Sequence, residues 1–100
     1  MRRAAKIDAN QPEIVEAMRK VGATVYYIKE PVDLLVGYRK RTIAMEVKNP
    51  GGDWKLTPQQ EVFFRDFAGE AYIVESIHEA LLALNRKVSS WSDRGRNERT

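Results

Sequence analysis

The stretch that decides the fold is residues 31–48, PVDLLVGYRKRTIAMEVK. It holds two runs of apolar and β-branched residues, 32–36 and 42–47, on either side of a turn rich in arginine and lysine. Short runs of this kind, bounded by turn residues, are typical of paired β-strands. The stretch therefore predicts two neighbouring strands that carry Asp33, Glu46 and Lys48.

The segments on both sides of this hairpin alternate between helical and strand patterns. Residues typical of capping boxes stand where three helices would begin, with the pairs Asn10 and Glu13, Thr57 and Gln60, and Ser76 and Glu79. The order α-β-β-β-α-β-α predicts an α/β domain, a mixed sheet flanked by helices. The expected elements are a helix from the Asn10 cap to about Lys20, strands 23–28, 32–36 and 42–47, a helix from Thr57 and Pro58 to Gly69 with Phe63, Phe64 and Phe67 as its buried stripe, a strand 71–75, and a helix from the Ser76 cap to about Lys87.

Length and composition limit the class of protein. With 100 residues and 43% hydrophobic content, the chain can bury one core, and we expect a single domain at residues 1–88. Residues 89–100 are polar and basic, with Trp91 as their only large apolar side chain, so we expect a flexible tail there. No apolar stretch approaches the roughly 20 residues that cross a bilayer, so we expect a cytoplasmic protein with no membrane partner.

The residue types restrict any metal chemistry to hard ions. The chain has no cysteine and a single histidine, His78, so thiolate and imidazole zinc sites are excluded. Carboxylate oxygens would have to bind a metal, which favours Mg2+ or Mn2+. The net charge of +3 is concentrated at the two ends of the sequence, which could hold a nucleic-acid backbone or could serve solubility alone.

The two predicted strands of the hairpin bring acidic and basic side chains together. Alternation along the strand places Glu46 and Lys48 on one face, and antiparallel pairing can bring Asp33 beside Glu46. Two carboxylates at that distance repel each other unless a cation or proton lies between them. The alternative is that Glu46 and Lys48 form an ion pair on an exposed strand, worth about 0–1 kcal/mol.

Asp33, followed after twelve residues by Glu46-Val47-Lys48, resembles the active-site signature of the PD-(D/E)XK nucleases. More narrowly, the stretch from about Asp8 to Leu84 resembles the VRR-NUC group, which is similar to archaeal Holliday-junction resolvases and has a restriction-endonuclease-like core. The family usually has proline directly before the aspartate, whereas here Val32 separates them. The matching segments are Pro31-Val32-Asp33, Glu46-Val47-Lys48 and Leu56-Thr57-Pro58-Gln59-Gln60.

The resemblance implies that Asp33, Glu46 and the Val47 carbonyl hold Mg2+, with Mn2+ able to substitute. It implies that Lys48 orients or helps deprotonate the attacking water, or stabilises charge that develops on phosphorus. It implies a DNA endonuclease that cuts structured or branched DNA during replication, recombination or repair. Related standalone forms occur in phages and work as homodimers, and no small-molecule cofactor is implied. Two alternatives remain: a nucleic-acid-binding module that lacks turnover, and a structural domain whose acids form salt bridges.

Two glutamines, Gln60 and Gln11, are further candidates for the catalytic centre. Each precedes apolar residues of its helix by three, four and seven positions, so each extends the stripe that faces the sheet. Gln60 is also the N3 residue of the Thr57 capping box, and this role alone could explain it. Related resolvases carry a metal-linked glutamate at the place of Gln11, so a role behind the metal ligands is expected for this amide.

Two groups of residues are candidates for contacts with DNA. Trp54 and Lys55 lie in the glycine-rich segment after Lys48, where Trp54 could stack on a base or fold back onto the core. The turn between the central strands carries the second group, which could contact DNA or form a solvated hairpin tip. This group consists of Arg39, Lys40 and Arg41.

Overall fold

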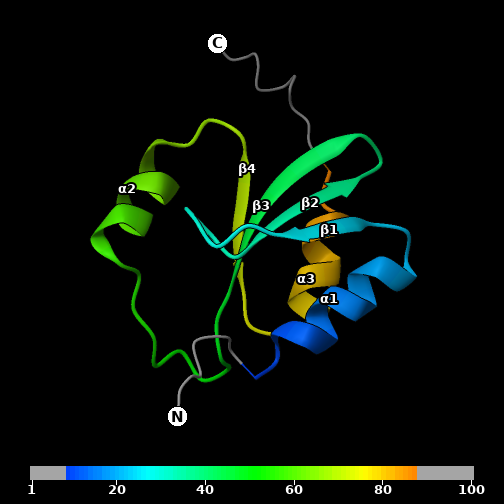
Figure 1. The fold of residues 1–100 in the computed structure, drawn as a ribbon, viewed down its shortest axis with the longest axis horizontal. Helices are drawn as coiled ribbons and strands as arrows, with labels where there is room; N and C mark the ends of the chain where they lie inside the picture. The colour runs from blue at the N-terminus through cyan, green and yellow to red at the C-terminus, as the bar shows by residue number, and fades with distance from the viewer. Residues whose placement is uncertain (1–8, 88–100) are drawn as a thin grey trace.

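A four-stranded sheet with three helices forms the protein (Figure 1). The computed structural model describes residues 9–87, so the basic residues 1–8, the domain end at residue 88 and the expected tail 89–100 lie outside the described residues. The α/β class and the predicted element order are confirmed. In chain order the elements are α1 (Gln11–Lys20), β1 (Thr24–Tyr27), β2 (Leu34–Tyr38), β3 (Arg41–Val47), α2 (Pro58–Asp66), β4 (Glu70–Val74) and α3 (Ile77–Leu84).

The sheet is mixed, with the strand order β1-β2-β3-β4. The first three strands form an antiparallel meander, and β4 pairs in parallel with β3, with Val47 opposite Val74. Parallel neighbours require a crossover, and the chain between β3 and β4 supplies it, with α2 inside it. Within residues 9–87, no helix combines the length and the apolar character needed to cross a membrane.

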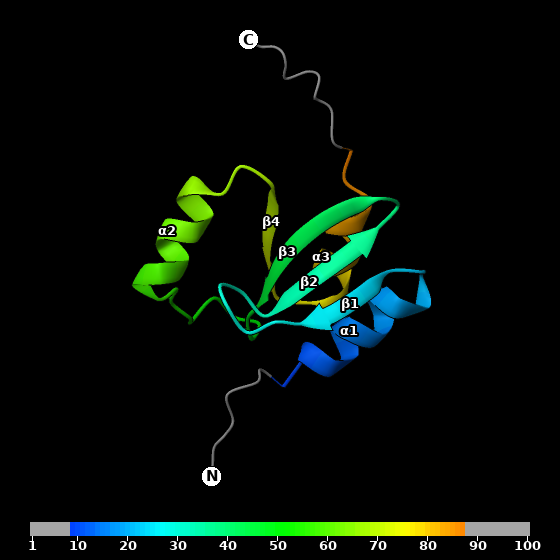
Figure 2. The ribbon, with the colours of Figure 1, turned by 45° about the horizontal axis from the view of Figure 1, so that its top comes forward.

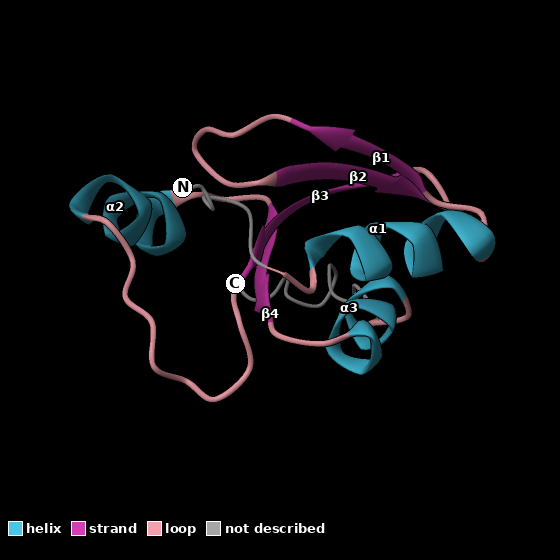
Figure 3. Ribbon diagram, turned by 60° about the horizontal axis from the view of Figure 1, so that its bottom comes forward, coloured by secondary structure: helices cyan, strands magenta, loops and turns pink. Residues whose placement is uncertain are grey.

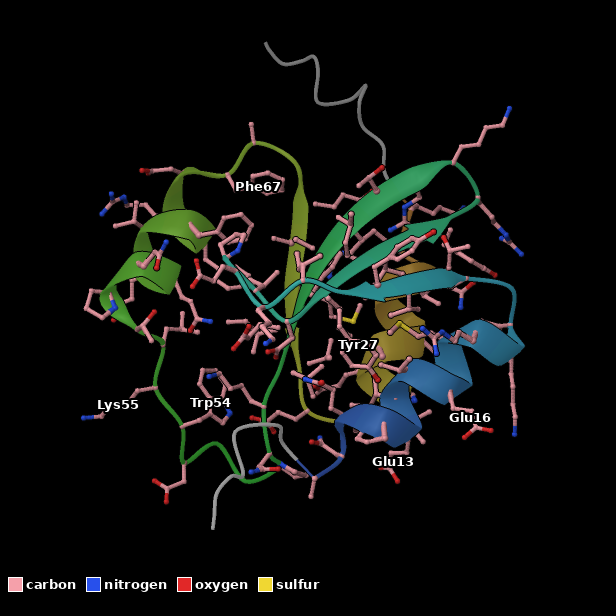
Figure 4. All side chains as sticks on the ribbon, viewed as in Figure 1. Glu13, Glu16, Tyr27, Trp54, Lys55 and Phe67 are labelled. Atoms are coloured by element: carbon pink, nitrogen blue, oxygen red, sulfur yellow. The ribbon has the colours of Figure 1, made fainter. Side chains whose placement is uncertain are left out.

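The hydrophobic core lies between one face of the sheet and the helices α1 and α3, which lie side by side against that face (Figure 3). Strand alternation sends every second residue of β2 and β3 into this core. On the other side of α1, Glu13 and Glu16 are exposed and point away from the sheet (Figure 4). The central core side chains are Ile14, Met18, Leu34, Val36, Ile43, Met45, Val47, Val74 and Leu84.

The helix α2 lies apart from α1 and α3 (Figure 2). It contributes no buried residue, so the predicted buried aromatic stripe is wrong. The helix ends at Asp66, and the ring of Phe63 contacts those of Phe64 and Phe67, with ring centroids 5.2 and 4.7 Å apart. Phe63 and Phe64 are half-buried, and Phe67 is exposed. The spacing identified the apolar side of the helix correctly but could not tell how much of the sheet would cover it.

The three predicted caps have different outcomes. Thr57 and Gln60 form a complete capping box, and the hydroxyl of Ser76 accepts a hydrogen bond from the N–H of Glu79. Asn10 stands at the N-cap position of α1 but makes no side-chain cap, which corrects the sequence prediction. Its amide nitrogen instead donates to the carbonyls of Lys48, at 3.1 Å, and Glu75, at 2.9 Å. Asn10 therefore ties the start of α1 to the ends of β3 and β4.

The opposite ends of β3 and β4 are joined by an ion pair. The guanidinium of Arg41 donates to both carboxylate oxygens of Glu70, with the shorter contact at 2.6 Å, and also to the carbonyls of Ala83 and Leu84 at the end of α3. This hydrogen-bonded pairing with Arg41 holds the pKa of Glu70 below its usual value, although partial burial opposes the shift. A cation at the carboxyl end of a helix also complements the helix dipole.

The first prediction concerns this ion pair. A carboxylate with a lowered pKa in the folded state stabilises the fold above its unfolded pKa, about 4.3, and loses that contribution as the pH falls through the folded pKa. We expect Glu70→Gln to lower the free energy of unfolding by about 1–2 kcal/mol at pH 7, and by progressively less below about pH 4.3. Urea unfolding at pH 7, 5 and 3.5 measures this. An equal loss at all three pH values would contradict the electrostatic account.

Candidate active site

Asp33 and Glu46 lie side by side at the open end of the β2–β3 hairpin. Asp33 comes one residue before β2 begins, so the strand starts later than residues 32–36 predicted. The register pairs Leu34 with Met45, and one further step places Asp33 opposite Glu46. The N–H of Asp33 donates to Oε1 of Glu46 at 3.1 Å, and the N–H of Val47 donates to Oδ2 of Asp33 at 2.9 Å. The backbone of each strand therefore holds the carboxylate of the other.

Glu46 is a buried charged residue. Its neighbours Met45 and Val47 point into the core under α1 and α3, so Glu46 points to the opposite face of the sheet, yet it is only 4% exposed. A buried carboxylate is tolerated only with polar partners, and Glu46 has the N–H of Asp33 and the ammonium of Lys48, 3.2 Å from Oε2. The lysine side chain is 16% exposed. Glu46 and Lys48 therefore form the ion pair that the alternative interpretation expected, but the pair is mostly buried and does not lie on an exposed strand.

The atoms around Asp33 suit a hard divalent ion. The N–H and C=O groups of one strand residue point to the same edge, so the Val47 carbonyl faces the side on which its N–H meets Asp33. Two carboxylates and a carbonyl are a donor set that Mg2+ accepts when water or phosphate completes its six positions. Within residues 9–87, no three side chains of the types Asp, Glu and His gather at one point. A metal here would thus depend on Asp33, Glu46 and backbone oxygen.

The segment after Lys48 turns back over the strand ends. Gly51 and Gly52 have φ angles of 112° and 73°, a conformation that side chains disfavour, and they let the chain reverse. Trp54 is directed toward the strands while Lys55 points away (Figure 4). The indole N–H of Trp54 donates to Oε2 of Glu75 at 2.5 Å. Trp54 has therefore folded back, and base stacking by this residue stays a prediction.

Sequence reasoning missed Glu75. In the parallel register Val47 lies opposite Val74, so the next residues, Lys48 and Glu75, leave their strands side by side on the same face. The sequence predicts Glu75 as the last residue of the strand 71–75, and a carboxylate at a strand end is the signal that could have found it. That signal becomes informative only once β4 is known to pair in parallel with β3, and a single sequence does not specify this pairing.

The two glutamine candidates occupy different surroundings. Gln60 completes the Thr57 capping box, and its amide nitrogen also donates to the carbonyl of Pro31 at 3.3 Å, which ties α2 to the segment before Asp33. Gln11 is 3% exposed on the sheet-facing side of α1. It follows Asn10, whose side chain bonds to Lys48 and Glu75, so Gln11 lies close to the ends of β3 and β4. Catalytic roles for both glutamines stay predictions.

The basic residues of the hairpin turn lie at the far end of β3. Arg39 and Lys40 are exposed, and the side chain of Arg39 lies over the ring of Tyr38 at 5.0 Å. Glu46 comes six positions after Lys40 along an extended strand, a distance of about 20 Å. Arg41 is held by Glu70 and by two carbonyls of α3, so a DNA contact through it would require that ion pair to open. The structure thus does not bring these residues to the site.

A cavity of about 490 Å³ lies between β4 and α3. Its lining includes Tyr72 and Val74 from β4, Leu82 from α3, and Arg86, which follows α3. It contains none of the residues around Asp33. The candidate active site is therefore separate from this cavity.

Comparison of the chain with models of protein families finds no match, and comparisons with curated proteins and with solved structures find no significant similarity. The link with the VRR-NUC nucleases therefore stays a prediction. It depends on the residues of the motif and on the way in which the fold arranges them.

The second prediction tests the buried position of Glu46. Glu46→Gln keeps an oxygen that can accept from the N–H of Asp33, whereas Glu46→Ala leaves that N–H and the Lys48 ammonium without their partner. In metal-free buffer we expect unfolding free energies within about 1 kcal/mol of the parent for the glutamine variant and about 2–4 kcal/mol lower for the alanine variant.

Urea unfolding in the presence of EDTA measures both variants. Glu16→Ala is the matched control, because this carboxylate is exposed on the surface of α1. Its ion pair is with the exposed Lys20, at 3.8 Å. Its expected change is below about 0.5 kcal/mol. Equal losses for the glutamine and alanine variants would show that the acceptor oxygen is not what the fold needs at Glu46.

Proposed function

We propose that the protein is a Mg2+-dependent nuclease of the PD-(D/E)XK type that hydrolyses phosphodiester bonds in DNA. The observation that carries the proposal is the buried carboxylate of Glu46, adjacent to Asp33 on one side and to Lys48 on the other. Two neighbouring carboxylates weaken a fold through their repulsion, and a cation-dependent function is a physical reason for such an arrangement.

Asp33, Glu46 and the Val47 carbonyl are the groups that would hold the ion. Mg2+ bound there supplies Lewis acidity toward a phosphoryl oxygen and a more acidic water, and Mn2+ accepts the same oxygen donors. Both carboxylates are oriented in advance by hydrogen bonds, Asp33 from Val47 and Glu46 from Asp33. Ligands fixed in this way lose less entropy when they bind an ion.

Lys48 supplies the positive charge of the proposed site. Its ammonium lies beside Glu46, two residues along the strand on the same face. From that position it can orient or deprotonate the attacking water, or stabilise negative charge that develops on the phosphoryl oxygens. The amine is not one of the proposed metal ligands, so its contribution can be separated from metal binding by mutation.

The proposed substrate is structured or branched DNA, as the resemblance to the resolvase-like nucleases implies. The domain has little room to enclose a duplex, and we propose that two copies act together as a homodimer. The proposed setting is the cytoplasm, that of a host cell for a phage-encoded enzyme. A module that binds nucleic acid without cleaving it is the second candidate, and it is favoured by Gln11, an amide where related resolvases carry a carboxylate.

The hairpin tip supports a contact with DNA. The turn between β2 and β3 has only two residues, Arg39 and Lys40, with φ angles of 51° and 68°. Two-residue turns with positive φ at both positions favour Asn-Gly, and other side chains there cost on the order of 1 kcal/mol each. Two exposed basic residues held at this cost are consistent with a role in binding phosphates.

The third prediction separates metal binding from chemistry. We expect Asp33→Asn and Glu46→Gln to abolish Mg2+-dependent cleavage, because each removes a negative charge that the ion needs. We expect Lys48→Ala to slow the chemical step about 10²–10⁴-fold with little change in DNA affinity, because it removes a positioned charge and no metal ligand. Single-turnover assays use linear, flapped, forked and four-way DNA with Mg2+, Mn2+ or EDTA.

Each outcome of these assays identifies one candidate. Parent-like cleavage by Asp33→Asn or Glu46→Gln would remove the site assignment. If the parent binds all four substrates but cuts none of them, the non-catalytic module becomes the better reading. If it neither binds DNA nor responds to Mg2+, the acids serve the fold alone.

The fourth prediction concerns the hairpin tip. Replacing Arg39-Lys40 with Asn-Gly should raise the free energy of unfolding by about 1 kcal/mol, because these residues fit the turn better. The same variant should bind DNA more weakly, with a salt dependence that is shallower by up to about two charges. Urea unfolding and DNA anisotropy between 50 and 200 mM salt, about the range over which phosphate contacts weaken, measure the two effects.

Lys20→Asn is the control for charge, because Lys20 is an exposed cation on α1. It should leave the salt dependence of binding unchanged. A tip variant that is more stable but binds DNA with the parent's salt dependence would show that the tip does not contact DNA.

A further inference from the structure

Within residues 9–87, three groups contact the ammonium of Lys48. One is the carboxylate of Glu46, 3.2 Å from Nζ. The other two come from the segment that turns back after β3: the carbonyl of Lys55, 3.4 Å from Nζ, and the ring of Trp54, whose centroid is 5.9 Å away. The position of the amine therefore depends on where this segment lies.

Among the described residues, the shortest hydrogen bond that holds this segment is the one from the indole of Trp54 to Glu75. Residues 49–53 are all exposed, so apolar packing does not fix this part of the chain. A hydrogen bond to a carboxylate is about twice as strong as one between neutral groups. Glu75 is thus the group on which the placement of Trp54 depends.

The strand ends below this contact are themselves fixed. Lys48 and Glu75 follow the paired residues Val47 and Val74, and the N–H of Lys48 donates to the carbonyl of Val74 at 2.9 Å. The buried side chain of Asn10 donates to the carbonyls of both Lys48 and Glu75. Both side chains therefore leave the backbone from fixed points, and Trp54 bridges them, with its N–H on Glu75 and its ring near Lys48.

From these contacts we infer that Glu75 and Trp54 are positioning residues for Lys48. Glu75 fixes the indole, and the indole ring and the Lys55 carbonyl hold the ammonium beside Glu46. The inference rests on the proposed function, because it states how the amine of the proposed nuclease is set in place. In this role both residues act through Lys48, which is separate from the base stacking predicted for Trp54.

The chemistry of the two added neighbours suits this role. A lysine side chain has four flexible carbons, and fixing it costs up to about 2 kcal/mol of rotamer entropy. A carbonyl and an aromatic face attract an ammonium without carrying a negative charge. They can therefore fix the amine while leaving its charge available to a phosphoryl oxygen, which a further carboxylate would not do.

The experiment uses four variants of the full chain in a Trp91→Phe background, so that Trp54 is the only tryptophan. Glu75→Ala removes the acceptor, Glu75→Gln keeps an acceptor oxygen, and Trp54→Phe keeps a ring but loses the N–H. Glu61→Ala removes an exposed carboxylate from α2 as the control. Thermal unfolding by circular dichroism verifies that each variant is folded.

Two readouts do not depend on cleavage. The emission maximum and acrylamide quenching of Trp54 report whether the indole is held, and the rate of reductive methylation of Lys48, followed by peptide mass spectrometry, reports whether the amine is held. We expect Glu75→Ala to shift Trp54 emission to the red and increase its quenching. Glu75→Ala and Trp54→Phe should both label Lys48 faster, whereas Glu75→Gln and Glu61→Ala should resemble the parent.

A third readout is single-turnover cleavage. Misplacing a catalytic group by about 1 Å can cost up to about 10²-fold in rate. We therefore expect cleavage by Glu75→Ala and Trp54→Phe to slow about 10–10²-fold, with Glu75→Gln restoring the rate. DNA affinity should stay close to that of the parent in Glu75→Ala.

The inference is overturned if Glu75→Ala labels Lys48 at the parent's rate, whether or not Trp54 emission changes. If Lys48 labelling follows the expected pattern but no protein, the parent included, cleaves DNA, the positioning is upheld and the proposed nuclease function fails. If the parent cleaves DNA but the variants label Lys48 at the parent's rate, the proposed nuclease function is upheld and the positioning inference fails. The two failures are therefore distinguishable.

Discussion

The burial of the Glu46 carboxylate is the constraint on which the rest of the structure depends. A charged group that is 4% exposed costs several kcal/mol unless polar partners surround it, and those partners must come from defined positions. Here they are the backbone of Asp33 and the ammonium of Lys48. A shift of one residue in the β2–β3 register would move Glu46 to the other face and away from the N–H of Asp33, while Lys48, on the same strand, would move with it. The hairpin register and the position of the Glu46 carboxylate are therefore fixed by the same contact.

The pairing of β3 with β4 extends this constraint to the helices. Asn10 joins α1 to the ends of both strands, and Arg41 joins the other ends to Glu70 and to the last turn of α3. The core between the sheet and the two helices is therefore bounded at both ends by polar contacts between distant parts of the chain. By contrast, α2 depends on its own capping box and on the link from Gln60 to Pro31.

The sequence predicted the features that depend on local pattern. Alternation and turn residues were sufficient for the hairpin that places Asp33 beside Glu46, and capping residues located the start of α2 and α3. The missed features depend on parallel pairing between segments far apart in the chain. Asn10 bonds to residues 38 and 65 positions away, and Glu75 meets Trp54 only because β4 returns beside β3. Neither contact produces a periodic pattern of residues from which the sequence could have predicted it.

The two ends of β3 hold their cations in different ways, and this difference bears on which cation the proposed chemistry would use. At the start, Arg41 donates to a carboxylate and two carbonyls, so its charge and its donors serve the fold. At the end, Lys48 has one carboxylate neighbour, while its other neighbours are a neutral carbonyl and a ring. Within the described residues, Arg41 makes four hydrogen bonds, whereas the polar contacts of Lys48 are fewer and longer, at 3.2 and 3.4 Å, so Lys48 keeps more of its attraction for an incoming phosphate. For this reason the proposed role in catalysis falls to Lys48 and not to the more extensively bonded Arg41.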